Sequence, residues 1–79
     1  MTNEPDPPTG NFLVLRGEYV TLAQAVKAVG LVGSGAQAKH LVRDGAVTVN
    51  GTVAIQPGRK LRAGDRFGVT GGGKWTITA

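Results

Sequence analysis

The sequence of 79 residues contains no cysteine and a single histidine. It therefore lacks both the disulfides and the zinc ligands that often stabilise small domains. No apolar run approaches the roughly 18 residues that cross a bilayer, and the first residues are acidic and proline-rich, unlike a secretory signal. We therefore expect one soluble, cytoplasmic domain that contacts no membrane and needs no metal or other cofactor.

Acidic residues are also few, since five oppose nine lysines and arginines. Two of the five, Glu4 and Asp6, lie in residues 1–10, which we expect to form a disordered, acidic, proline-rich tail. Residues 11–79, the expected folded domain, then carry a net charge of 9 − 3 = +6. Such a basic domain attracts polyanions, but the same charge can serve solubility alone. Charge by itself leaves both alternatives open.

Groups that perform catalysis are missing as well. The chain has no second histidine and no pair of carboxylates at helical spacing. Its remaining acids occur near turn signals, where they commonly accept hydrogen bonds from the backbone, and His40 is interpreted as a surface histidine. Without a nucleophile, a base and a group to orient them, we predict no enzymatic activity and no catalytic residues.

Aromatic residues make up only 5% of the chain. Proteins that stack single-stranded bases usually carry interleaved aromatic residues on an exposed sheet. We expect Phe12 and Phe67 to fill the core, whereas Tyr19 and Trp75 fit either a core or a surface position. The aromatic pattern therefore argues against recognition by base stacking.

Two short helices are predicted by apolar residues at helical spacing. The first spans residues 21–29 and ends at Gly30, a residue suited to the left-handed conformation. The second begins at Ser34, where Gln37 three positions later predicts a capping box, and ends at Gly45. Helices joined by so few residues must pack together. The apolar face of the second helix consists of Ala38, Leu41 and Val42.

Beyond residue 45 the apolar spacing changes to 2, as in strands. Asn50-Gly51 predicts a type I′ hairpin, flanked by Val47, Val49 and Val53, with Thr48 and Thr52 on the opposite side. Residues 67–69 and 74–77 predict a terminal hairpin around three glycines, and residues 12–15 a further strand. The fold class is therefore α+β, with two short packed helices on a small, mostly antiparallel sheet.

Basic residues gather in two places. On the second helix, Gly35, Lys39 and Arg43 form one line at intervals of four residues, and the backbone N–H groups at its start suit a phosphate. The second cluster spans residues 59–62 and adds Arg66, with Leu61 as an apolar anchor. The alternative for the helix is a solvated face with an ordinary cap, and for the second cluster it is a charged loop on an edge strand that deters aggregation. The candidate binding residues are Ser34, Gly35, Lys39, Arg43, Arg59, Lys60, Arg62 and Arg66.

Two segments resemble one known family. Residues 34–51, SGAQAKHLVRDGAVTVNG, and residues 57–65, PGRKLRAGD, are similar to the S4-type RNA-binding domain, or αL motif, and the short chain resembles its small stand-alone bacterial members. The resemblance covers residues 18–69. It implies two helices on a small sheet that present a basic surface to structured RNA, often ribosomal RNA, in association with the ribosome. It also implies turn-building roles for Asn50, Gly51, Gly64 and Asp65.

The sequence departs from that family pattern in two places. Many members carry arginine where Gly35 follows the helix-starting serine, and many begin the first helix with an Arg-x-Asp-like segment where residues 18–21 read EYVT. Affinity is therefore expected to depend more on Arg43 and on residues 59–66. The predicted function is non-catalytic binding of structured RNA, with ribosomal RNA as the expected target. The alternative is a basic adaptor that docks an acidic protein.

Overall fold

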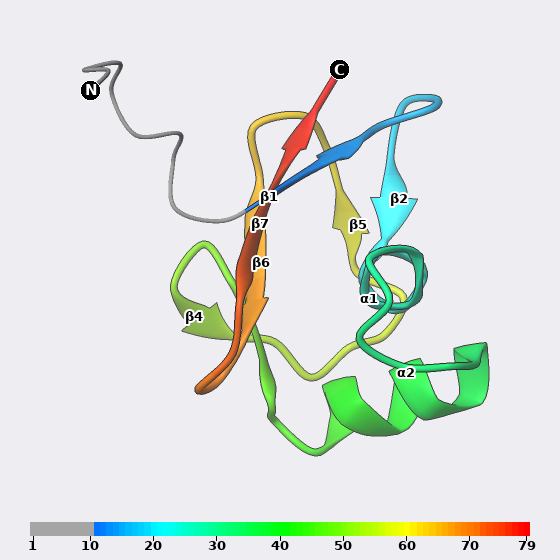
Figure 1. Cartoon of the computed structure of the whole chain (residues 1–79), viewed down its shortest axis with the longest axis vertical. Helices are drawn as coiled ribbons and strands as arrows, with labels where there is room; N and C mark the ends of the chain where they lie inside the picture. Colours follow the sequence, from blue (N-terminus) through cyan, green and yellow to red (C-terminus); the bar gives the residue numbers. More distant parts are fainter. Residues whose placement is uncertain (1–10) are drawn as a thin grey trace, which may run out of the picture.

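The computed structural model describes residues 11–79 (Figure 1). The predicted tail, residues 1–10, lies outside the described residues. The two helices are α1 (Leu22–Ala28) and α2 (Gly35–Arg43). A five-stranded sheet contains β1 (Asn11–Val14), β3 (Val47–Val49), β4 (Thr52–Val53), β6 (Arg66–Val69) and β7 (Lys74–Thr78). A separate two-stranded ladder contains β2 (Val20–Thr21) and β5 (Lys60–Leu61). The predicted α+β fold class is confirmed.

The sheet has the strand order β1-β7-β6-β3-β4. The antiparallel pairs β3–β4 and β6–β7 are the two predicted hairpins. Strand β1 pairs in parallel with β7, so that Phe12 lies opposite Thr76; local sequence signals did not predict this pairing. None of the helices within residues 11–79 has the length and apolar character of a membrane span.

One face of the sheet packs against the helices and forms the core. Phe67 and Ile77 are buried there, and the ring of Trp75 stacks on Phe67 with 5.6 Å between the ring centroids. Among the described residues no polar or charged residue is buried, so the core is held by apolar contact alone. The remaining buried residues are Leu22, Ala23, Ala25, Val26, Ala38, Val42, Val47, Val49, Ala54 and Leu61.

The helix starts are fixed by side-chain caps. At α1, Thr21 Oγ1 accepts from the Gln24 N–H, and Gln24 Oε1 accepts from the Thr21 N–H, which completes a capping box. At α2, Ser34 Oγ accepts from the Gln37 N–H as predicted. Gln37 Oε1, however, accepts at 2.8 Å from Gly33 rather than from Ser34. The predicted capping box at Ser34 is therefore only half correct, because the side-chain-free Gly33 lets the amide reach one residue further back.

The first hairpin has the predicted turn, but one of its residues lies on the other side of the sheet from the one expected. Asn50 and Gly51 have φ of 52° and 87°, as a type I′ turn requires. A two-residue turn pairs Thr48 with Val53, and paired residues share a face of the sheet. Val53 is consequently 54% exposed, and the expectation that it lies on the side opposite Thr48 is wrong.

The expected position of Phe12 is also wrong. It was expected in the core but is 49% exposed. Its parallel partner Thr76 lies on the same face as Arg66, whereas the neighbouring Leu13 pairs with the buried Ile77. Because successive residues of a strand point to opposite faces, this register directs Phe12 away from the helices. We call the side of the five-stranded sheet that is turned away from the helices the outer sheet face.

Gly68 generates the first prediction. A Cβ at this position would lie 2.7 Å from the Gly73 carbonyl oxygen and 3.1 Å from Lys74 Cγ. We expect Gly68→Ala to lower the free energy of unfolding by about 2 kcal/mol, measured by urea denaturation. The control is Gly35→Ala, where a Cβ meets nothing within 4 Å and alanine favours the helix. Equal stability of the two variants would contradict the role of Gly68.

Candidate nucleic-acid interface

The helix basic face, defined as Gly35, Lys39 and Arg43, lies on the solvent side of α2. Ala38 and Val42 are fully buried, while Lys39 and Arg43 are exposed. A side chain added at Gly35 would meet nothing within 4 Å, so the start of the helix is open to an approaching group. The structure therefore places Ser34, Gly35, Lys39 and Arg43 along one element with both cations in solvent.

The basic segment 59–62 is held against the start of α1. The N–H groups of Leu22 and Ala23 donate to the Arg59 and Pro57 carbonyl oxygens at 2.8 and 3.0 Å. These bonds satisfy N–H groups that the first turn of a helix leaves without partners. The same bonds fix the backbone of residues 57–59, so Arg59 extends from a constrained segment rather than from a loose loop.

Lys60 and Leu61 continue this segment as strand β5. This strand pairs with β2, and Lys60 lies opposite Thr21. Leu61 is fully buried, as expected of an anchor. Lys60 Nζ lies 4.8 Å from the centroid of the Tyr19 ring, which is itself 44% exposed. This cation–π contact limits the positions of the ammonium group without neutralising its charge. Arg59, Lys60 and Arg62 are all exposed.

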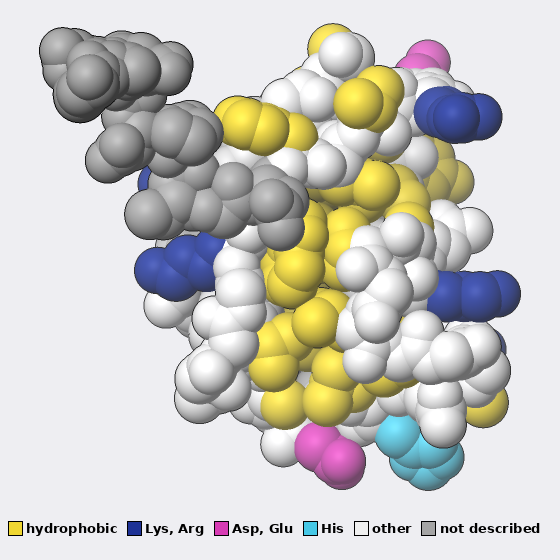
Figure 2. Space-filling model, in the orientation of Figure 1, with side chains coloured by type: hydrophobic (Ala, Val, Ile, Leu, Met, Phe, Trp, Pro, Cys, Tyr) yellow, Lys and Arg dark blue, Asp and Glu magenta, His cyan; other side chains and the backbone are white. Residues whose placement is uncertain are grey.

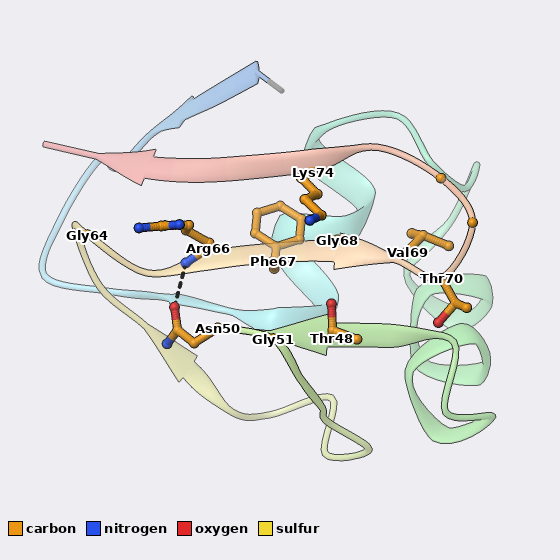
Figure 3. Close-up of a pocket in the computed structure, with 12 residues that line it drawn as sticks. Thr48, Asn50, Gly51, Gly64, Arg66, Phe67, Gly68, Val69, Thr70 and Lys74 are labelled. Carbon is orange, nitrogen blue, oxygen red and sulfur yellow. Dashed lines mark hydrogen bonds between the residues drawn. The ribbon is translucent and has the colours of Figure 1, made fainter. Parts of the chain in front are cut away.

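A hydrogen-bond network of Asn50 and Asp65 joins two turns that lie apart in the sequence. Asp65 Oδ2 accepts from the Arg62 N–H at 2.8 Å, and Asp65 Oδ1 accepts from Asn50 Nδ2 at 3.2 Å. Asn50 Oδ1 in turn accepts from the Arg66 N–H at 3.0 Å (Figure 3). The left-handed Asn50 and the Asp65 carboxylate therefore position the backbones of Arg62 and Arg66, in agreement with the turn-building roles that the family resemblance implies.

Arg66 does not belong to the same surface as the helix basic face. The next residue, Phe67, is buried under the helices, so Arg66 and Gly68 belong to the outer sheet face. Lys74, which pairs with Gly68, lies there too. Figure 2 shows lysine and arginine side chains at the left and right margins of the view, with hydrophobic side chains gathered between them. The eight predicted residues therefore do not form one continuous site.

Sequence reasoning missed Lys74 because no other cation lies near it in the sequence. The alternation of the predicted terminal hairpin contained a signal, since it separates the apolar Phe67 and Trp75 from their neighbours Arg66 and Lys74. The sequence correctly placed Thr48 on the side of its strand opposite Val47 and Val49, but it gave Thr48 no functional role. Within residues 11–79, no three side chains of the kinds that bind metals are grouped to hold an ion.

The comparisons with known proteins agree with this architecture. The sequence profile of the S4 domain family matches residues 13–78 of the 79-residue chain. The chain therefore belongs to the S4 domain family, whose members are RNA-binding rather than catalytic domains. A comparison with curated proteins finds no match.

The network of Asn50 and Asp65 generates the second prediction. Asn50→Gly keeps the positive φ but removes the side-chain bonds, and Asp65→Ala removes both acceptors. Each variant is expected to lose about 1–2 kcal/mol of unfolding free energy. Because the two side chains bond to each other, the double variant should lose less than the sum, by about 0.5–1 kcal/mol. Additive losses in urea denaturation would show that the network is not a unit.

Proposed function

We propose that the protein binds structured RNA without catalysis, in the cytoplasm and in association with the ribosome, with ribosomal RNA as its target. The observation that carries the proposal is the helix basic face, which lies in solvent on a helix whose opposite side is buried. Membership of the S4 domain family supports RNA as the class of ligand. Because protein side chains cannot read the deep major groove of an RNA helix, recognition rests on shape and phosphates.

The spacing of the helix basic face suits a phosphate backbone. Lys39 and Arg43 are four residues apart, or about 6 Å along the helix axis, so each can contact a different phosphate of one strand. The guanidinium of Arg43 can bind two phosphate oxygens at once, whereas the Lys39 ammonium acts as a point charge. The absent side chain at Gly35 leaves room for the RNA backbone at the positive end of the helix.

The basic segment 59–62 supplies further contacts in this proposal. Its exposed cations flank the start of α1, which packs beside α2 through buried residues of both helices. The backbone bonds to Leu22 and Ala23 reduce the ordering needed when RNA binds. Arg59, Lys60 and Arg62 are therefore assigned to the same RNA as the helix basic face, whereas Arg66 lies on the outer sheet face.

The third prediction tests the helix basic face by charge reversal. Lys39→Glu combined with Arg43→Glu should lower affinity for a fluorescent RNA hairpin at low salt by about tenfold or more, while circular dichroism and thermal unfolding stay native. The control is Arg16→Glu combined with Lys27→Glu, which makes the same charge change at exposed positions elsewhere. Equal losses in both variants, or unchanged affinity in the first, would place the site elsewhere.

The fourth prediction concerns salt. Neutralising phosphates releases counterions, so the logarithm of the binding constant should fall with the logarithm of salt concentration by about 0.7–0.9 per phosphate contacted. Lys39→Ser combined with Arg43→Ser should make that slope shallower by about 1.5–2. Fluorescence anisotropy across a salt series measures both values. A binding constant that does not change with salt would favour the adaptor alternative. So would an acidic protein that copurifies with this chain and stays bound after ribonuclease treatment.

A further inference from the structure

The outer sheet face carries an ordered set of polar and aromatic side chains. Phe12 of β1 pairs with Thr76 of β7, and Thr76 pairs with Arg66 of β6. These three residues form one row across adjacent strands, which ends at Asn50 through its hydrogen bonds to Arg66. The next row contains Lys74, Gly68 and Thr48. The helices pack on the opposite side, so no described element covers these rows.

A shallow cleft of about 700 Å³ lies over this face (Figure 3). The turn of Asn50 and Gly51 borders it on one side and the glycine turn after Val69 borders it on another. Gly68 lies in the middle of the sheet without a side chain, with Lys74 Cγ 3.1 Å from the position that a Cβ would take. At the bottom of the cleft, Gly68 has no side chain and the aliphatic part of Lys74 lies beside it. The cleft is also lined by Thr48 and Thr70, whose side chains carry hydroxyl groups.

The charge of the cleft is positive. Arg66 and Lys74 are diagonal neighbours on adjacent antiparallel strands, a relation that separates Cα atoms by about 7–8 Å. The acidic neighbour, Asp65, directs its two carboxylate oxygens to the Arg62 N–H and to Asn50 Nδ2. That carboxylate is engaged in building the turn, so the two cations remain available to an anionic ligand.

Phe12 adds an aromatic surface to the same row. It is 49% exposed, and it lies two strands from Arg66, or about 10 Å away at the usual strand spacing. Unpaired bases stack on exposed aromatic rings, while basic side chains follow the backbone that joins them. Duplex RNA offers no unpaired base for such a ring. The sequence argued against base stacking because Phe12 was expected in the core. The exposed position of Phe12, in one row with Arg66 and close to Lys74, removes that ground and fits a single strand.

We propose that the outer sheet face binds a single-stranded stretch of RNA, with phosphates at Arg66 and Lys74 and a base stacked on Phe12. The inference rests on the proposed function and deepens it, because it divides one RNA between two surfaces. The helix basic face takes the folded part, and the outer sheet face takes an unpaired stretch that continues from it. Arg66 is thereby assigned to the single strand rather than to the helix site.

The test compares a blunt RNA hairpin with the same hairpin carrying a long uridine tail at either end. The readout is the ratio of the two affinities. A general loss of positive charge weakens binding of both hairpins and therefore leaves this ratio unchanged. Wild-type protein should bind the tailed hairpin about tenfold more tightly. Arg66→Ser combined with Lys74→Ser should abolish that ratio and leave the affinity for the blunt hairpin largely intact. Lys39→Ser combined with Arg43→Ser, which removes the same charge, should weaken both probes and preserve the ratio.

Single variants at the sheet edges test stacking. Phe12→Ser should remove most of the gain from the tail, Phe12→Trp should retain it, and ultraviolet crosslinking should join the uridine tail to residue 12. Val53→Ser, at a similarly exposed apolar position on the opposite edge strand, should leave the gain unchanged. Circular dichroism verifies that each variant is folded.

The outcomes separate the two proposals. If the tail adds no affinity, or if both double variants change the ratio equally, the single-strand site is overturned while the helix site stands. If the helix double variant binds the blunt hairpin like the wild type, the proposed function of the helix basic face is overturned. Loss of the tail gain in the Val53 control would show that the effect is general to the sheet and would also overturn the inference.

Discussion

The hydrogen-bond network of Asn50 and Asp65 determines where the backbones of Arg62 and Arg66 lie, and with them the basic residues outside α2. The side chains of the exposed Asn50 and the half-buried Asp65 join turns about 15 residues apart and thereby fix where β5 ends and β6 begins. Arg62 and Arg66 are bonded through their backbones, so their guanidinium groups remain available to ligands. The Asp65 carboxylate therefore positions the backbone near two arginines and forms no ion pair with either guanidinium group. An ion pair would have neutralised the positive charge of this surface.

The parts of the fold that could be predicted from the sequence depend on interactions between near neighbours. Ser34, Asn50-Gly51 and Gly30 act within a few residues, and their cap, turn and positive φ are observed. The parallel pairing of β1 with β7 joins strands separated by most of the chain, and no local pattern encodes it. Phe12 was misassigned for that reason, because its face is set by the distant partner.

The candidate site shows the same division. Lys39 and Arg43 were predicted correctly as solvent-exposed neighbours, because residues four apart in the sequence lie next to each other on the surface of a helix. Arg66 was grouped with residues 59–62 because they are close in sequence, yet the alternation of β6 places it on the outer sheet face with Lys74. In a sheet, the partner strand and its register decide which cations meet, and these follow from the tertiary fold.

The strand order has a consequence for how the domain forms during synthesis. Strand β7 lies between β1 and β6, so β1 acquires its hydrogen-bonded neighbour only after every other element has left the ribosome. Until then the apolar residues of β1 stay in solvent, and the sheet is incomplete on that side. Helices α1 and α2 and the β3–β4 hairpin can form early from local contacts, whereas closure of the sheet is a late, long-range step. Strand β1, the first of the strands within residues 11–79, is therefore among the last to be folded.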